Sequence, residues 1–193
     1  MSSKAISLLT PEQYLEMERR SEFRSEYLNG QVFAMSGGTM NHARIVRNVL
    51  LRLSEQLKGK RCEAFANDLR LFCARYDIFT YPDIVIGCGA SKFLDDRRDT
   101  ITDATAIVEV LSPGTMNYDR GEKFRYYRSL ESFSEYLLLA QDTPRAEYHV
   151  RQPDGSWIFR EFTSPRSAVE LNSVDCRLDL ESVYETVEFD QVP

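Results

Sequence analysis

Two acidic residues stand in segments that are otherwise apolar and strand-like. Asp83 lies in Pro82–Ile86, and Glu109 lies in Ala106–Leu111. Both segments are short, β-branched and apolar on both faces, which is typical of central strands in a covered sheet. An ionised carboxylate is costly in such a place unless it is paired or binds a metal. If the strands are neighbours, the two carboxylates could share one hard ion, Mg²⁺ or Mn²⁺, which would favour hydrolysis of a phosphodiester.

A lysine on the following helix is the third candidate. The segment from about Asn117 to Leu130 predicts a helix that buries Phe124 and Tyr127. Lys123 stands at the border of that buried stripe, so its stem could follow the sheet and emerge at the strand ends. There it could position a water molecule or stabilise charge that develops on a phosphate. The alternative is a surface ion pair with Asp119, worth only about 0.3 kcal/mol.

Periodicity and turn residues predict the other elements. Asn29-Gly30 indicates a tight hairpin turn, and Gly59 ends a long amphipathic helix. The order of elements predicts an α/β fold, in which a mixed central β-sheet is flanked by helices. The remaining elements are helices at 11–19 and 41–58, a hairpin at 25–36, strands at 62–66, 69–74 and 136–140, a hairpin of 147–151 with 156–162, an exposed loop at 89–103 and a helical turn at 180–184.

Length and composition predict one globular domain. The chain has 193 residues, 42% of them hydrophobic and 28% charged, which is an ordinary globular balance. We expect a single domain over 1–193, with a core at about 10–163 and a C-terminal extension at 164–193. The net charge of −6 argues against a protein that coats nucleic acid through nonspecific phosphate contacts. A nuclease remains possible, because its acidic residues can hold a metal while a local basic face holds the strand.

The cysteines and the termini bear on the compartment. Cys62, Cys73, Cys88 and Cys176 lack the spacing of a zinc half-site, and the chain is neither short nor cysteine-dense. We therefore expect four reduced thiols in a cytoplasmic protein. No signal peptide is evident, and no stretch approaches the roughly 20 apolar residues of a membrane helix.

Three blocks of sequence, taken in order, resemble the Uma-type family of bacterial restriction endonucleases. They are Tyr81-Pro82-Asp83, Val108–Pro113 and Tyr118–Lys123. The family belongs to the restriction-endonuclease-like PD-(D/E)xK superfamily, in which a proline-aspartate motif is followed by an acid-x-lysine motif. The resemblance covers nearly the whole chain, including Glu26–Gly30 and His42. It implies a magnesium-dependent endonuclease that hydrolyses DNA.

The resemblance also implies residue roles. Asp83 and Glu109 would be the metal ligands, and the carbonyl of Val110 could add an oxygen. Leu111 stands where the superfamily has its lysine, and Lys123 on the next helix would replace it. Glu26 would complete the acidic cluster. Asn29 stands where the family more often has an aspartate. A homodimer is plausible, since two related sites can cut both strands of a duplex.

Each candidate residue also has a structural explanation. Asp83 could cap a turn after Pro82, Glu109 could pair with an arginine, and Glu26 could be a cross-strand partner in an exposed hairpin. His42 is better explained by a structural hydrogen bond near the helix N-terminus than as a ligand. The charge runs at 18–20 and 95–98 are expected to be solvated, and arginines 120, 125 and 128 could contact phosphates or solvent.

Two other functions remain open. The first is a non-catalytic nucleic-acid or protein interaction module on the same fold, which the acidic net charge favours. The second is a metal-dependent hydrolase acting on a small phosphoester.

Overall fold

The N-terminal part of the chain forms a short helix and a hairpin. The computed structural model describes residues 8–35 and 37–189. Helix α1 (Pro11–Glu18) begins with a capping box, in which Thr10 and Gln13 exchange hydrogen bonds. Strands β1 (Ser25–Leu28) and β2 (Gln31–Ala34) form the predicted hairpin. Its turn residues, Asn29 and Gly30, have φ angles of 45° and 93°, which glycine and asparagine tolerate best.

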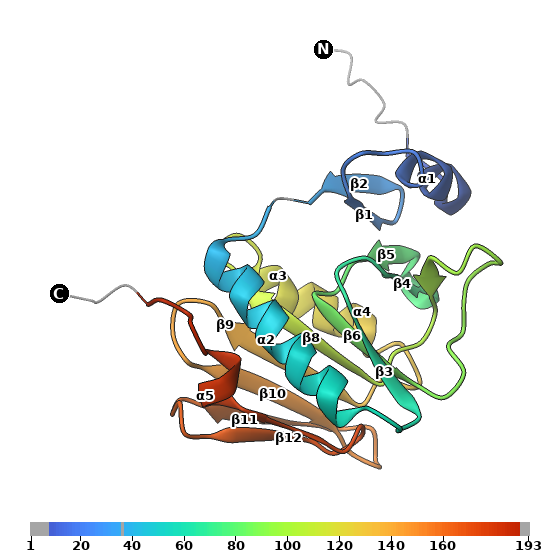
Figure 1. Ribbon diagram of the computed structural model, residues 1–193. Helices are drawn as coiled ribbons and strands as arrows, with labels where there is room; N and C mark the ends of the chain where they lie inside the picture. Colours follow the sequence, from blue (N-terminus) through green and yellow to red (C-terminus); the bar gives the residue numbers. More distant parts are fainter. Residues whose placement is uncertain (1–7, 36, 190–193) are drawn as a thin grey trace.

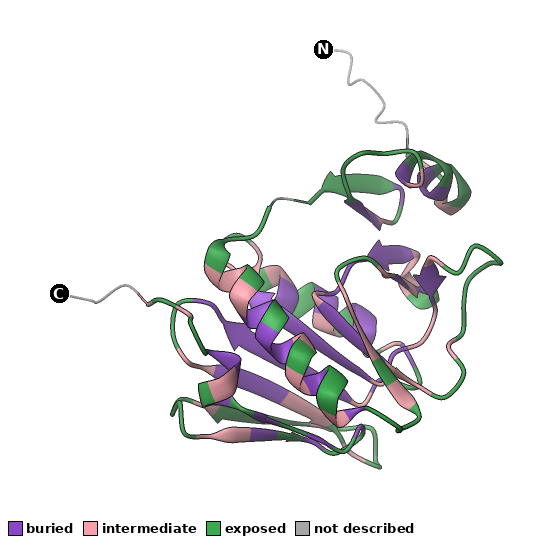
Figure 2. Ribbon diagram, viewed as in Figure 1, coloured by how far each residue is buried: buried purple, intermediate pink, exposed green. Residues whose placement is uncertain are grey.

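The larger sheet has six strands in the order β11-β10-β9-β8-β6-β3. Only β8 and β9 run parallel, so the sheet is mixed, as predicted. In Figure 2, β8 and β9 are buried along their length, which explains why both read as apolar runs. The bounds are β3 Cys62–Ala66, β6 Ile84–Cys88, β8 Ala106–Leu111, β9 Glu135–Ala140, β10 Ala146–Arg151 and β11 Trp157–Phe162.

A second sheet of five strands joins the N-terminal hairpin to the middle of the chain. Its order is β2-β1-β5-β4-β7, with β4 at Arg70–Cys73, β5 at Ile78–Thr80 and β7 at Thr100–Ile101. Figure 1 shows α1, β1 and β2 at the end of the molecule beyond β4 and β5. Strands β5 and β7 have only three and two residues, too few to give a periodic signal. The predicted loop at 89–103 is therefore not irregular throughout.

Helix α2 (Met40–Gln56) covers one face of the larger sheet (Figure 1). Its buried residues include Ile45, Val49 and Leu53, as the predicted helical spacing requires. The same face is covered by the C-terminal strands β12 (Ala168–Leu171) and β13 (Cys176–Asp179) and by α5 (Leu180–Val183). These elements share one apolar cluster with α2 and the sheet.

The opposite face of the sheet carries the predicted helix after Glu109, in three consecutive parts. Helix α3 (Met116–Tyr118) leads into a π-helical turn, η2 (Asp119–Lys123), and then into α4 (Phe124–Tyr127). A short 3-10 turn, η1 (Ala74–Tyr76), follows β4. Tyr127 is fully buried, in agreement with the predicted stripe. A π-helical turn inserts an extra residue into a helix and often occurs at functional sites.

The cysteines do not all agree with the sequence prediction. Cys62 on β3 and Cys88 on β6 lie opposite one another and form a disulfide bond. Cys73 and Cys176 are free and buried. The prediction of four reduced thiols is therefore wrong for two, because strand pairing brings together residues 26 positions apart. No helix in the described part of the chain combines the length and apolarity needed to cross a membrane.

Candidate functional site

Asp83 and Glu109 meet because β6 and β8 are neighbours. The antiparallel register pairs Ile84 with Val108, which places Asp83, just before β6, beside Glu109. The Asp83 backbone N–H donates to Glu109 Oε2 at 3.2 Å, and the Val110 N–H donates to Asp83 Oδ2 at 2.7 Å. Asp83 therefore does more than cap a local turn, since its carboxylate is held by the neighbouring strand.

Lys123 lies at the centre of an acidic cluster. Its Nζ donates to Glu109 Oε1 at 3.0 Å and lies 3.2 Å from Asp119 Oδ1 and 3.6 Å from Glu26 Oε1. The lysine side chain is only 9% exposed, so it does not emerge at the strand ends as expected. Asp119 and Lys123 bound the π-helical turn, and both side chains point into the protein. The pair with Asp119 exists, but as a buried contact.

The electrostatics of this cluster are dominated by burial and by an excess of acid. Burial would lower the pKa of Lys123, but Glu109 and Glu26 outweigh it and raise that pKa well above its usual value. Burial also raises the pKa of Glu109, and the charges of Asp83 and Asp119 add to this effect. Three carboxyl groups thus surround a single lysine, and a fourth, that of Asp83, lies beside Glu109. A further cation beside the cluster would offset this excess of negative charge and favour the ionised carboxylates.

The second sheet supplies the other walls of the site. Glu26 on β1 is buried, and its Oε1 accepts a hydrogen bond from the Tyr81 backbone N–H at 3.3 Å. It is therefore not a residue of an exposed hairpin. On the helix side, the Tyr127 hydroxyl donates to Glu109 Oε1 at 2.9 Å. Glu109 is thus paired with Lys123 and Tyr127, and its cationic partner is a lysine rather than the arginine considered as an alternative.

His42 is the residue that sequence reasoning placed outside the site. His42 lies in the first turn of α2, and its Nε2 is 3.0 Å from Asp83 Oδ1. The predicted structural hydrogen bond is present, and its partner is the central aspartate. Burial would lower the pKa of His42, but the bond to Asp83 outweighs it and raises that pKa. The two side chains are 20% and 15% exposed, so this is the part of the site nearest to solvent.

Several other predicted positions lie outside the cluster. Arg120 forms an ion pair with Glu147, Arg125 pairs with Glu122, and Arg128 lies over the ring of Phe124. Asn29 lies in the turn between β1 and β2, and its N–H donates to the carbonyl of Asp77, which directly precedes β5. The site therefore draws on Glu26, Asp83, Glu109 and Lys123 together, with His42 added.

The charge run at 18–20 is partly buried, whereas the run at 95–98 is exposed, as expected. Glu18 is 6% exposed and accepts hydrogen bonds from Ser25 and Tyr81. Arg19 pairs with Asp95 and Asp99 across the chain. The prediction fails here because α1 packs against the second sheet and the 89–103 segment, and no local pattern shows that contact.

The side chains alone supply only part of the ligand set that a hard divalent ion requires. Within residues 8–35 and 37–189, no three acidic, histidine or cysteine side chains are grouped to hold one ion. Asp83 and Glu109 nevertheless offer adjoining carboxylates. Mg²⁺ is commonly bound by one or two carboxylates, and water and substrate phosphates complete its shell. The residues therefore fit a metal that is shared with a phosphate-bearing substrate.

A mixed sheet covered by helices, with strand carboxylates beside a buried lysine, defines an α/β protein of restriction-endonuclease-like fold. A solved structure supports this class. A crystal structure of a putative nuclease belonging to DUF820, from Anabaena variabilis, matches with a TM-score of 0.77 and 16% identity, covering 93% of this chain and 99% of that one.

The chain belongs to the Uma2 family, described as putative restriction endonuclease, whose model matches residues 11–181. Two uncharacterized proteins of Synechocystis sp. are also similar. The first, sll1609, is 29% identical over 86% of this chain and 93% of its own length. The second, slr1290, is 32% identical over 94% of each chain. The family supports a nuclease role, and the solved structure supports the fold.

Proposed function

We propose that this protein is a magnesium-dependent endonuclease that hydrolyses DNA phosphodiester bonds. The observation that carries the proposal is the contact between the Asp83 and Glu109 strands, beside a buried lysine. Glu109 lies inside a covered strand, where a carboxylate costs several kcal/mol unless its charge is used or paired. The family and the nuclease-like fold make a phosphodiester the substrate that best explains this arrangement.

Asp83 and Glu109 would hold Mg²⁺ or Mn²⁺, with the Val110 carbonyl as a further oxygen and Glu26 completing the acidic surroundings. A bound ion would polarise a phosphoryl oxygen and lower the pKa of a water molecule. His42 orients Asp83 through the hydrogen bond at its Oδ1. Lys123 keeps its proton between three carboxylates, so it can orient water or stabilise charge that develops on the phosphate.

The proposal is tested by calorimetric titration of Mn²⁺ into the wild type and into Asp83→Asn and Glu109→Gln, with circular dichroism as the folding check. Asp68→Asn is the matched control, because Asp68 is exposed and pairs only with Arg24 at the surface. We expect Mn²⁺ binding, and nicking of supercoiled plasmid in Mg²⁺, to be lost in both site variants and kept in the control.

Titration in the presence of a DNA duplex tests whether the metal binds only when a substrate phosphate supplies a further ligand. No Mn²⁺ binding by the wild type, with or without duplex, would refute the metal site. Metal binding without cleavage of any DNA would favour the non-catalytic interaction module instead. Cleavage of a small phosphodiester that duplex DNA does not inhibit would favour the phosphoester hydrolase. The homodimer stays a separate prediction, to be measured by sedimentation.

A further inference from the structure

Helix α2 and the turn after it are strongly basic in an acidic protein. Residues 40–61 carry Arg44, Arg47, Arg52, Lys58, Lys60 and Arg61 against a single acid, Glu55. The whole chain has a net charge of −6. A local basic stripe of this kind is the electrostatic signature of phosphate binding, which net charge alone conceals.

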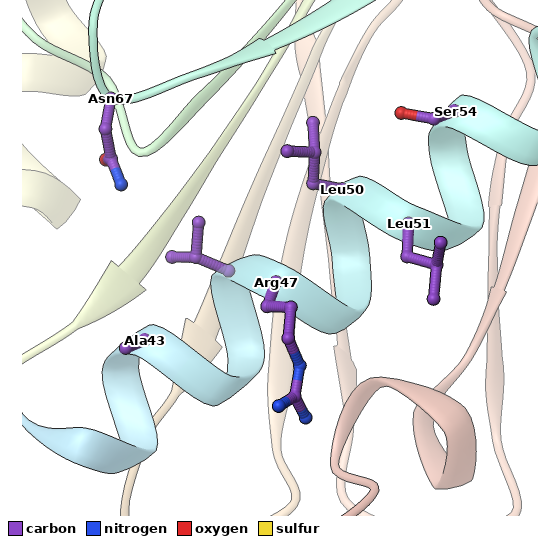
Figure 3. Close-up of a pocket in the computed structure, with 7 residues that line it drawn as sticks. Ala43, Arg47, Leu50, Leu51, Ser54 and Asn67 are labelled. Carbon is purple, nitrogen blue, oxygen red and sulfur yellow. The ribbon is translucent and has the colours of Figure 1, made fainter.

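The basic helix begins at the candidate active site. His42, in its first turn, contacts Asp83. A shallow groove of about 470 Å³ then follows one side of α2, between the helix and the turn at Asn67. Figure 3 shows Ala43, Arg47, Leu50 and Leu51 along the helix, with Asn67 across the groove.

The Asn67 backbone N–H donates to the carbonyl of Asp83 at 3.1 Å, so one wall of the groove is tied to the site. The arginine series of α2 begins two residues after His42, which contacts Asp83. A strand bound along these arginines would therefore approach the carboxylates.

The acidic C-terminal segment, residues 183–189, lies along the same helix. Arg44 Nη2 donates to Glu188 Oε1 at 3.0 Å, and Arg52 Nη2 donates to Glu185 Oε2 at 3.1 Å. Arg47 Nη2 donates to the Thr186 hydroxyl at 3.1 Å. Figure 1 shows the chain after α5 running toward the N-terminal end of α2. Carboxylate oxygens thus occupy Arg44 and Arg52 in the way that phosphate oxygens would, and a hydroxyl oxygen contacts Arg47.

These ion pairs are of a kind that a polyanion could displace. The side chains of Glu188 and Glu185 are 82% and 61% exposed, and exposed ion pairs contribute only about 0–1 kcal/mol each. Arg52 Nε is buried and has no hydrogen-bond partner in the described part of the chain. A guanidinium has five N–H donors and matches phosphate oxygens in pairs, so the arginines have unused capacity.

We propose that Arg44, Arg47 and Arg52 bind the phosphate backbone of the DNA substrate, and that Glu188 and Glu185 occupy Arg44 and Arg52 when DNA is absent. The inference rests on the proposed function for its ligand. From Arg44 to Arg52 the helix rises roughly 12 Å, enough to follow three or four nucleotides of one strand. The C-terminal segment then acts as an internal competitor for the substrate track.

The test is fluorescence anisotropy of a labelled DNA duplex in EDTA, where binding is separated from metal-dependent cleavage. The Glu185→Gln/Glu188→Gln variant should bind about tenfold more tightly, because the competing charges are removed. Glu181→Gln is the matched control, since Glu181 lies on α5, just before the acidic segment, and makes no ion pair among the described residues. Its affinity should equal that of the wild type.

The second experiment uses the variant Arg44→Gln/Arg47→Gln/Arg52→Gln. Arg75→Gln is its control, because Arg75 is exposed on η1, outside α2. The triple variant should bind more weakly. The slope of log K against log salt should also fall by about 0.9 for each phosphate that the variant no longer neutralises. Thermal melting of every variant identifies any loss of fold.

The outcomes separate the two proposals. If neither the acidic nor the arginine variants change affinity, while the wild type cleaves DNA, the track is overturned and the nuclease stands. If only the arginines matter, the competition by Glu185 and Glu188 is overturned. If affinity shifts as expected but no DNA is cleaved in Mg²⁺, the nuclease fails and the binding track stands. No binding by any variant overturns the track.

Discussion

Lys123 is the residue on which the acidic cluster depends. Among the described residues it is the one cation in contact with Glu26, Glu109 and Asp119, and these side chains are almost completely buried. A buried ion pair is weak evidence of net stabilisation, since desolvation offsets the attraction. Removing only its cation is different, because the acids that remain have no compensating charge.

We therefore expect Lys123→Met to lower the free energy of unfolding by about 3–5 kcal/mol at neutral pH. Methionine keeps the length and apolar stem of lysine, so the loss reports the charge rather than a cavity. Urea denaturation followed by circular dichroism measures it. Lys92→Met, in an exposed loop, is the control and should change stability by less than about 0.5 kcal/mol. An equally small effect at Lys123 would show that the cluster is already neutralised by protons.

At the scale of elements, α1 is held to the 89–103 segment by charged side chains. Arg19 on the C-terminal cap of α1 pairs with Asp99 at 2.8 Å, and the buried Arg70 on β4 pairs with the same carboxylate. Hydrogen bonds from Arg19, and then from Arg70, hold the pKa of Asp99 well below its usual value. The Asp99 carboxylate thus joins three segments that are far apart in the sequence.

The lowered pKa gives Asp99 a defined pH dependence. Its contribution to stability is present in full above the ordinary aspartate pKa of about 3.9 and is lost as pH falls toward the lower folded value. Asp99→Asn should therefore destabilise the protein by about 2 kcal/mol at pH 7, and by less at pH 3. Chemical denaturation at both pH values measures the difference.

Asp96→Asn in the same segment serves as the control for Asp99, because Asp96 is exposed and forms no ion pair within the described residues. A pH-independent difference between Asp99→Asn and the wild type would show that the arginines do not perturb this carboxyl in the folded protein.

At the scale of the whole molecule, the C-terminal elements share the core of the larger sheet. Val169, Leu171, Leu178, Leu180 and Val183 belong to the same apolar cluster as α2. Each is almost completely buried. Removing them would expose the sheet face between α2 and β10.

A chain ending at residue 163 should consequently lose the cooperative unfolding of the full chain. Burying one such leucine or valine is worth about 1.5–3 kcal/mol, so losing five is comparable to the whole stability of a typical domain. Differential scanning calorimetry measures both chains. A cooperative transition in the shorter chain would support the predicted division into a core at 10–163 and an extension.

Elements with strong local signals were predictable from the amino-acid sequence. The Asn29-Gly30 turn, the amphipathic α2 and the apolar strands around Asp83 and Glu109 all form within the predicted ranges, allowing for ends that differ by one or two residues. Their signals are local, because turn geometry and side-chain periodicity depend on residues close together in the chain. The order of three motifs likewise indicated the family, and the order of the elements indicated the mixed sheet, before any contact was known.

The contacts between side chains that are distant in the sequence depend on the packing of the folded chain. His42 meets Asp83 across 41 positions, and Glu26 meets Tyr81 across 55. The Cys62–Cys88 pair and the burial of Glu18 depend in the same way on which strands and helices become neighbours. Strand register and packing fix such contacts, and the local pattern of residues does not encode the partner. For this reason the family motifs predicted Asp83, Glu109, Lys123 and Glu26 as one site, whereas the burial of Lys123 and the contact of His42 with Asp83 were not predicted.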